Sequence, residues 1–150
     1  MVYMDNLRSF SSIVLQHNES VLKSRSDAVI SVDVGDIRVQ SPVVLSNMPS
    51  CQNDLVLREF NNRQWPYVYH RLGGCDDVFR FTKMVNDEDW HLKSISVGVK
   101  PDDLAVLNQI QSAGLTVDWI TIDVALIYNQ TFSEHIKTVR QMFPSVYLIA

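Results

Sequence analysis

The chain has 150 residues, the length of one domain with a sizeable core, and 46% of them are hydrophobic while 20% are charged. This composition is typical of a folded globular protein and argues against a disordered tail. The formal net charge of -4, with Lys and Arg scattered along the chain, argues against nucleic acid or an anionic membrane as a partner.

The sequence carries no pattern typical of export or of a membrane span. No apolar run approaches the roughly 20 residues that cross a bilayer, and the opening MVYMDNLRSF lacks the basic-then-apolar order of a signal peptide. We therefore expect a cytoplasmic protein. Cys51 and Cys75 have neither metal-site spacing nor the density of a disulfide framework, so we expect reduced thiols and no metal site.

Residues 1–41 predict an N-terminal arm that leads into a β-hairpin. The polar stretch SSIVLQHNESVLKSRSD (11–27) predicts an irregular arm. The stretch AVISVDVGDIRVQ (28–40) alternates apolar and polar residues on both sides of Gly35 and Asp36, which predicts an antiparallel hairpin. Residues 42–150 have a different hydrophobic pattern and are expected to form a second, larger unit.

Five short segments rich in Val, Ile or Tyr recur at intervals of roughly 25 residues and predict strands. They are 42–48, 67–72, 92–99, 118–126 and 146–150. The last, VYLIA, is an unbroken apolar run, which is typical of a strand buried on both faces.

Helical patterns fill the gaps between these segments. In the third gap Pro101 suits a first helical position and Gly114 suits the residue after a helix end. Apolar residues at helical spacing give every gap a buried face, less clearly in the first. These residues are Val56 and Phe60; Val78, Phe81 and Val85; Leu104, Leu107 and Ile110; and Phe132, Ile136, Val139 and Phe143.

Alternating strands and helices predict parallel βαβ units, and two architectures contain them. One is a flavodoxin-type sheet, which needs a helix after its fifth strand. The other is an eight-stranded (β/α) barrel, which accepts the hairpin as a plug across its N-terminal end but needs about three further strands. Because the sequence stops on the fifth strand, we expect an α/β fold that is a partial (β/α)8 barrel, with four βα units and a fifth strand.

In either architecture a ligand binds where the parallel strands end. Asp123 follows the apolar WITI and is either an acceptor for a ligand hydroxyl or amide, or a carboxylate paired with Arg71 or the backbone. Arg71 either grips a phosphate or carboxylate with its forked guanidinium or forms that ion pair. His70 is more typical of an interior histidine than of a catalyst, and Met48 is core filling by default.

The order of the motifs resembles the IMP dehydrogenase and GMP reductase family, and most of all the compact GMP reductases of Gram-positive bacteria. The resemblance covers nearly the whole chain in order. The matching stretches are SRSD, PVVLSNM, YVYHRL, SISVGVK, ITIDVA and IKTVRQMFPSVYLIA.

This resemblance implies an NADPH-dependent enzyme that converts GMP to IMP and ammonia through a covalent adduct on a cysteine, and that assembles as a homotetramer. A purine nucleotide monophosphate and the nicotinamide cofactor would bind at the C-terminal rim of the barrel. The resemblance assigns Ser46, Asn47, Met48 and Arg71 to the nucleotide, and Asp123 and Ala125 to the cofactor.

Three departures from the family pattern stand out. Leu126 and Ile127 replace a His-Gly pair, and Ser46 resembles the Ser-x-Met of IMP dehydrogenases more than the Ala-Asn-Met of the reductases. Neither Cys51 nor Cys75 takes the place of the nucleophile, so no catalytic residue is assigned. We expect an N-terminal fragment that is inactive alone; an IMP dehydrogenase-like member, a non-catalytic half-barrel and a flavodoxin-like binding domain are the alternatives.

Overall fold

The structure is a computed structural model that describes residues 14, 16, 19–125 and 130–150. The predicted arm falls partly outside these residues, and its described part is irregular up to a single 3-10 turn at Arg25–Asp27. Among the described residues, no helix combines the length and the apolar character that a bilayer crossing requires.

The predicted hairpin is confirmed. Strands β1 (Val32–Val34) and β2 (Ile37–Val39) pair antiparallel, with Val34 opposite Ile37. Gly35 adopts a φ of +62° in the turn, which a residue with a side chain rarely adopts. The chain can therefore reverse its direction at this glycine.

Three of the predicted strands form a parallel sheet in chain order. Strand β3 (Ser94–Val97) pairs with β4 (Trp119–Ile122), and β4 pairs with β5 (Tyr147–Ile149). Ile95, Ile120 and Leu148 stand side by side in this register. The observed strands are shorter than their sequence segments.

The segments 42–48 and 67–72 do not form regular strands, which corrects the prediction. They join the sheet through single parallel bridges, Leu45 to Tyr67 and Tyr69 to Ile95. Pro42 and Pro66 have no backbone N–H to donate to a ladder, and the described residues provide no neighbour beyond Leu45. Both segments nevertheless extend the parallel order to five members.

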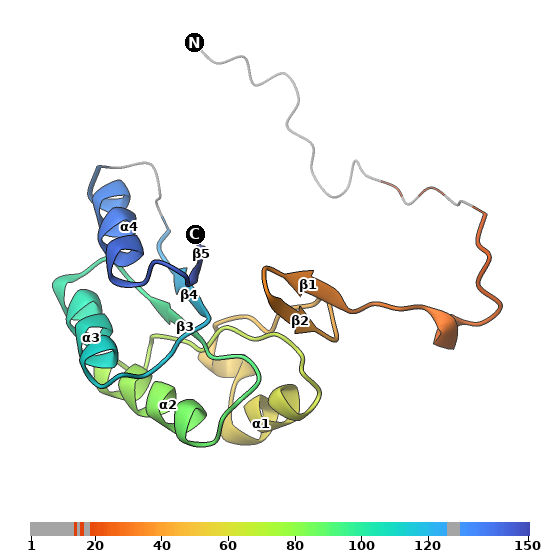
Figure 1. Cartoon of the computed structure of the whole chain (residues 1–150), viewed down its shortest axis with the longest axis horizontal. Coiled ribbons are helices and arrows are strands. Elements are labelled where there is room, and N and C mark those ends of the chain that lie inside the picture. The colour runs from red at the N-terminus through yellow and green to blue at the C-terminus, as the bar shows by residue number, and fades with distance from the viewer. Residues whose placement is uncertain (1–13, 15, 17–18, 126–129) are drawn as a thin grey trace, which may run out of the picture.

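This order decides between the two predicted architectures. The first segment neighbours the second, and the second neighbours β3, whereas a flavodoxin-type sheet places its first strand beside its third. Figure 1 shows the helices as one arc outside the strands. They are α1 (Asp54–Asn62), α2 (Cys75–Asp87), α3 (Pro101–Ser112) and α4 (Gln130–Met142).

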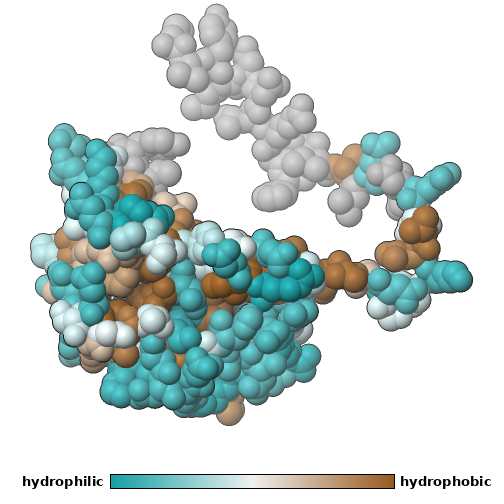
Figure 2. Space-filling view, viewed as in Figure 1, coloured by the Kyte–Doolittle hydropathy of each residue, from teal (hydrophilic) through white to brown (hydrophobic). Residues whose placement is uncertain are grey.

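The helices begin and end for local reasons. The Asn53 side chain caps α1 by accepting from the backbone N–H of Val56 at 3.0 Å. Pro101 opens α3, and Gly114, with a φ of +68°, follows its C-cap as predicted. Hydrophilic residues cover the outer surface of α1 and α2 (Figure 2), so each helix turns its apolar stripe toward the sheet.

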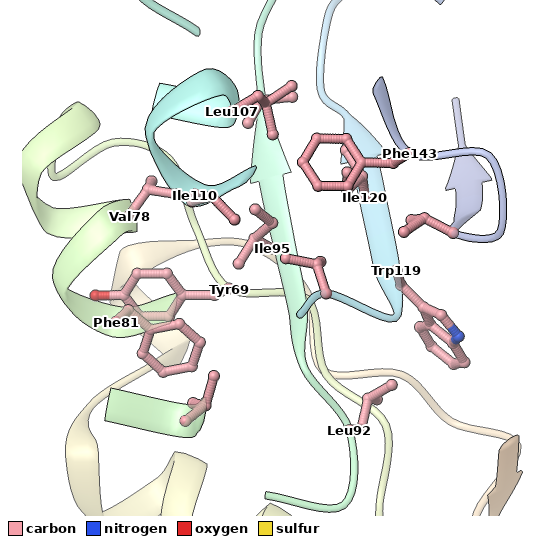
Figure 3. Close-up of a cluster of buried hydrophobic side chains, with 14 of the residues drawn as sticks. Tyr69, Val78, Phe81, Leu92, Ile95, Leu107, Ile110, Trp119, Ile120 and Phe143 are labelled. Carbon is pink, nitrogen blue, oxygen red and sulfur yellow. The ribbon is translucent and has the colours of Figure 1, made fainter. Parts of the chain in front are cut away.

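The core lies between this helix layer and the outer face of the sheet (Figure 3). Ile95 and Ile120 are fully buried beneath Leu107 and Ile110 of α3. The Tyr69 ring stacks on that of Phe81 in α2. The predicted stripes of α2, α3 and α4 contribute to this core, whereas α1 buries Leu57 and leaves Val56 and Phe60 half-buried.

The fifth strand is less buried than its sequence suggests. Val146 is buried, but Tyr147 and Leu148 are half-buried and Ile149 is exposed. The apolar run is typical of a strand covered on both faces, but within the described residues this strand is covered only in part. Strand β5 is the last member of the sheet, and the described part of the chain supplies no strand on its outer side.

The hairpin packs against the N-terminal end of the sheet, as expected for a plug. A Cβ atom on Gly35 would lie 1.6 Å from the ring of Tyr147, the first residue of β5, so the turn rests directly on that ring. The carbonyl oxygen of Arg38 lies 2.7 Å from Nε2 of His91, just before β3. The opposite, C-terminal end of the sheet carries the polar loops.

Candidate functional site

The candidate site is the rim formed by the C-terminal ends of the parallel segments. The His70 ring stacks on the ring of Tyr69, which faces the helix layer, so His70 lies on that side too. Side chains alternate along a strand, and Ile95 and Ile120 face the helix layer. By the same alternation Ser96 and Thr121, which stand opposite each other, lie on the inner face. The loops that follow these residues meet at one rim.

Arg71 and Asp123, 52 residues apart in sequence, meet at this rim. Nε of Arg71 donates to Oδ2 of Asp123 at 3.1 Å, and the side chains are 31% and 41% exposed. The pairing alternative of the sequence analysis is thus the observed one. An ion pair this exposed contributes about 1 kcal/mol or less, so a ligand can compete for either partner. Among the described residues, the Arg71 guanidinium has no other partner.

The other predicted residues lie along the same rim without direct contact to that pair. Ser46 is exposed and Asn47 is half-buried. Met48 is 54% exposed, so the interpretation as core filling is wrong. Its segment leaves the sheet after Leu45, so the described residues cover the Met48 side chain only in part. Ala125 is exposed, and Leu126 and Ile127 lie outside the described residues.

His70 is only half-buried, which is less than an interior histidine would be. Its ring stacks on Tyr69, with ring centroids 4.6 Å apart and an interplanar angle of 22°. Its Nδ1 is buried and finds no partner among the described residues. The ring is therefore positioned by stacking rather than by a side-chain hydrogen bond.

An acidic side chain in the first turn of α2 ties this helix to Tyr69 on the second segment. The Tyr69 hydroxyl donates to Oδ2 of Asp77 at 2.8 Å, and Arg80 pairs with the same carboxylate. Burial opposes ionisation of Asp77, but the hydrogen bonds from Arg80 and Tyr69 outweigh it and lower the pKa of this carboxyl. Burial, reinforced by Asp77, raises the pKa of Tyr69.

Asp103, in the first turn of α3, holds the loop that precedes this helix. Its carboxylate accepts from the backbone N–H of Gly98 at 2.8 Å and from that of Lys100 at 2.9 Å. Asp103 therefore fixes the loop that follows β3, whereas Asp77 ties α2 to the second segment.

Gln52 is a rim residue that the sequence analysis missed. It is 8% exposed, and its Nε2 donates to the carbonyl oxygens of Ser46 and Val68, each at 2.6 Å. Its Oε1 accepts from the backbone N–H of His70 at 3.3 Å. The stretch PSCQND is polar and reads as an exposed loop, so a single sequence holds no sign that this side chain is buried.

Neither cysteine has the surroundings of a nucleophile. Cys51 is exposed and Cys75 is half-buried, and both are free thiols. Burial and the nearby carboxylates of Asp103 and Asp102 raise the pKa of Cys75, which keeps this thiol protonated. Its Sγ donates to the Asp102 carbonyl oxygen at 3.3 Å.

These features define the class of fold. Five parallel segments in chain order, an outer layer of helices and polar loops at the C-terminal ends make up part of a (β/α)8 barrel, as expected. In structure the chain is similar to the inosine 5′-monophosphate dehydrogenase of Legionella pneumophila, with a TM-score of 0.75 and 17% sequence identity. The similarity covers 93% of this chain and 42% of that one.

Comparison of sequences extends this from the fold to a family. The chain is 31% identical over 150 residues to a GMP reductase of Lactococcus lactis subsp. cremoris, covering 98% of this chain and 45% of the relative. It is 32% identical over 142 residues to a GMP reductase of Oenococcus oeni, covering 94% and 43%. A GMP reductase of Helicobacter pylori is 28% identical over 141 residues, covering 94% and 43%.

No family model matches the sequence. The chain spans less than half the length of the curated relatives that it matches. Together, sequence and fold place it in the IMP dehydrogenase and GMP reductase family, where it corresponds to the N-terminal half.

Proposed function

We propose that this chain provides the first half of the nucleotide site of a GMP reductase-like enzyme, which uses NADPH to convert GMP to IMP and ammonia. Similarity to several curated GMP reductases supports this reaction class. The structural observation that carries the proposal is the meeting of Arg71 and Asp123 at the rim, 3.1 Å apart. It joins the segment that the resemblance assigns to the nucleotide to the one it assigns to the cofactor.

The exposed chemistry of the rim suits a purine nucleotide. The terminal nitrogens of Arg71 are donors for phosphate oxygens, because only its Nε is engaged among the described residues. The exposed Met48 provides a polarizable apolar contact for a purine ring, and Ser46 and Asn47 provide polar groups beside it.

The cofactor end of the rim rests on Asp123 and Ala125. The Asp123 carboxylate is 41% exposed and is an acceptor for a hydroxyl or amide group of a nicotinamide dinucleotide. Ala125, exposed beside it, leaves room for a ring to approach. NADPH would supply the hydride when bound, while these residues would hold and orient it.

Calorimetric titration of GMP and IMP into the 150-residue protein tests the nucleotide part of the proposal. We expect Arg71→Ala to weaken binding by about tenfold or more, because a charge-assisted hydrogen bond contributes about 1.5–3 kcal/mol. Asp123→Ala should weaken nicotinamide cofactor binding. Arg63→Ala is the matched control, because Arg63 is an exposed arginine paired with Glu59 on α1.

Equal affinity of the parent and Arg71→Ala for both nucleotides would contradict the proposal. A preference for IMP over GMP would favour the IMP dehydrogenase alternative, which the Ser46 position also suggests. Because no residue of this chain is assigned as nucleophile, we expect no NADPH oxidation with GMP from these residues alone. We also propose that the intact enzyme is a cytoplasmic homo-oligomer, a tetramer by resemblance.

A further inference from the structure

We propose that Gln52 is a positioning residue that holds the segments 42–48 and 67–72 in place relative to each other at the rim. It thereby sets the distance between the nucleotide-binding groups of the two segments. Its role in binding rests on the proposed function, whereas its role in rim geometry does not. The proposal concerns the three hydrogen bonds that its amide makes to Ser46, Val68 and His70.

The backbone alone holds these two segments together only at their beginning. The N–H of Leu45 donates to the carbonyl oxygen of Pro66 at 3.0 Å, and the N–H of Val68 donates to that of Leu45 at 3.1 Å. Toward the rim, the described residues make no further backbone hydrogen bond between the segments. Gln52 takes over at that point, because it binds Ser46 on one segment and Val68 and His70 on the other.

The amide group suits this role atom by atom. Nε2 carries two hydrogens and faces two carbonyl oxygens, each 2.6 Å away. Oε1 faces the backbone N–H of His70. If the amide were flipped, its NH2 group would face this N–H and its oxygen would face the two carbonyl oxygens, so all three hydrogen bonds would be lost. At 8% exposure, water cannot replace these bonds readily.

The anchored atoms lie next to the candidate nucleotide contacts. The Ser46 carbonyl group leads directly into Asn47 and Met48, and the His70 amide directly precedes Arg71. A shift of either segment would therefore move its contact group relative to the other. Such a shift affects binding because several groups must meet one ligand at once.

The first test measures rim geometry without a ligand. Gln52→Met keeps the length of the side chain but removes its hydrogen bonds, and we expect the backbone amide of His70 to exchange with solvent about tenfold faster. In Gln52→Glu the carboxylate still accepts from His70, so its exchange should stay closer to that of the parent. Gln141→Met, at an exposed position on α4, is the matched control.

The second test measures GMP affinity as a function of pH. At about pH 8 a carboxylate in Gln52→Glu faces two carbonyl oxygens without a hydrogen, so we expect affinity about tenfold below that of the parent. Burial and the two facing carbonyl oxygens disfavour the ionised form, so toward pH 5.5 a growing share of the carboxyl is protonated and donates to one of the oxygens, and the gap to the parent should narrow. A residue that only stabilises the fold would not produce this recovery after correction for the folded fraction.

The outcomes separate the two proposals. Unchanged exchange of the His70 amide in folded Gln52→Met would overturn the positioning role, whatever the ligand result. If the parent binds GMP and both Gln52 variants bind it equally well at every pH, the role in binding is overturned. If the parent binds neither GMP nor IMP, the proposed function fails, and the exchange result alone decides whether Gln52 positions the rim.

Discussion

His135 shows how burial sets the behaviour of a single residue. It lies in α4 at 5% exposure, and its Nε2 has no partner among the described residues. Burial lowers the pKa of this imidazole below its ordinary value of 6.5, although the nearby Asp103 opposes the shift. The folded protein therefore holds His135 neutral at a pH where an unfolded chain would already protonate it.

We expect stability to fall as the pH drops below about 6.5, because the unfolded state then binds more protons at His135 than the folded state does. The loss continues until the pH passes below the folded-state pKa of this residue. Urea unfolding at about pH 7.5 and about pH 5.5 measures this loss in the free energy of unfolding. His135→Leu should show a smaller difference between the two conditions, and an identical pH dependence in this variant would contradict the assignment.

At the scale of elements, two of the connections between strand and helix contain the same contact between an aspartate and a glycine. In the second and third βα units an aspartate in the first turn of the helix reaches back, Asp77 to the Tyr69 hydroxyl and Asp103 to the loop after β3, and a glycine leaves room for it. A Cβ on Gly73 would lie 2.2 Å from Oδ2 of Asp77, and one on Gly98 would lie 2.8 Å from Oδ2 of Asp103. Gly73 is therefore required by space rather than by backbone conformation, whereas at Gly98 only the tip of the Asp103 side chain would have to shift.

Gly73→Ala should lower the free energy of unfolding by about 1–3 kcal/mol, because the added methyl group displaces Asp77 from the Tyr69 hydroxyl. Denaturant unfolding of the variant measures this loss. In an Asp77→Ala background the same substitution should cost much less, since the obstructing carboxylate is gone. Additive effects of the two substitutions would show that the contact is not the cause.

At the scale of the whole molecule, the described residues leave parts of the sheet uncovered. Ser94 Oγ, Trp119 Nε1 and Thr121 Oγ1 are buried without partners there, and all three belong to inner-face positions. Val43 and Val44 are exposed at one edge of the sheet and Ile149 at the other. Figure 2 shows further apolar side chains along the hairpin and in the middle of the face of the molecule that is in view.

We expect the 150-residue protein to associate with itself, because exposed edges and apolar side chains favour contact between copies. Gel filtration combined with light scattering measures its mass in solution. Ile149→Lys places a charge on the β5 edge and should shift the protein toward the monomer, whereas Leu55→Lys, on the exposed face of α1, should not. A parent protein that is monomeric and unfolds cooperatively would count against this expectation.

The amino-acid sequence by itself determined the local elements and the type of fold. The hairpin around Gly35, the helices α2 to α4 and the three parallel strands follow from periodicity, turn residues and caps. These patterns are read within a few neighbouring residues, so one sequence contains them. The family resemblance then favoured the barrel and assigned the rim residues.

Only the tertiary structure decided how those residues meet. The Arg71–Asp123 pair joins residues 52 positions apart, and the burial of Gln52 depends on two segments that converge around it. Met48 is exposed and β5 is half-covered for the same reason, since burial is set by which segments lie beside a residue. Local patterns carry propensities, but contacts between distant segments exist only once the chain has folded.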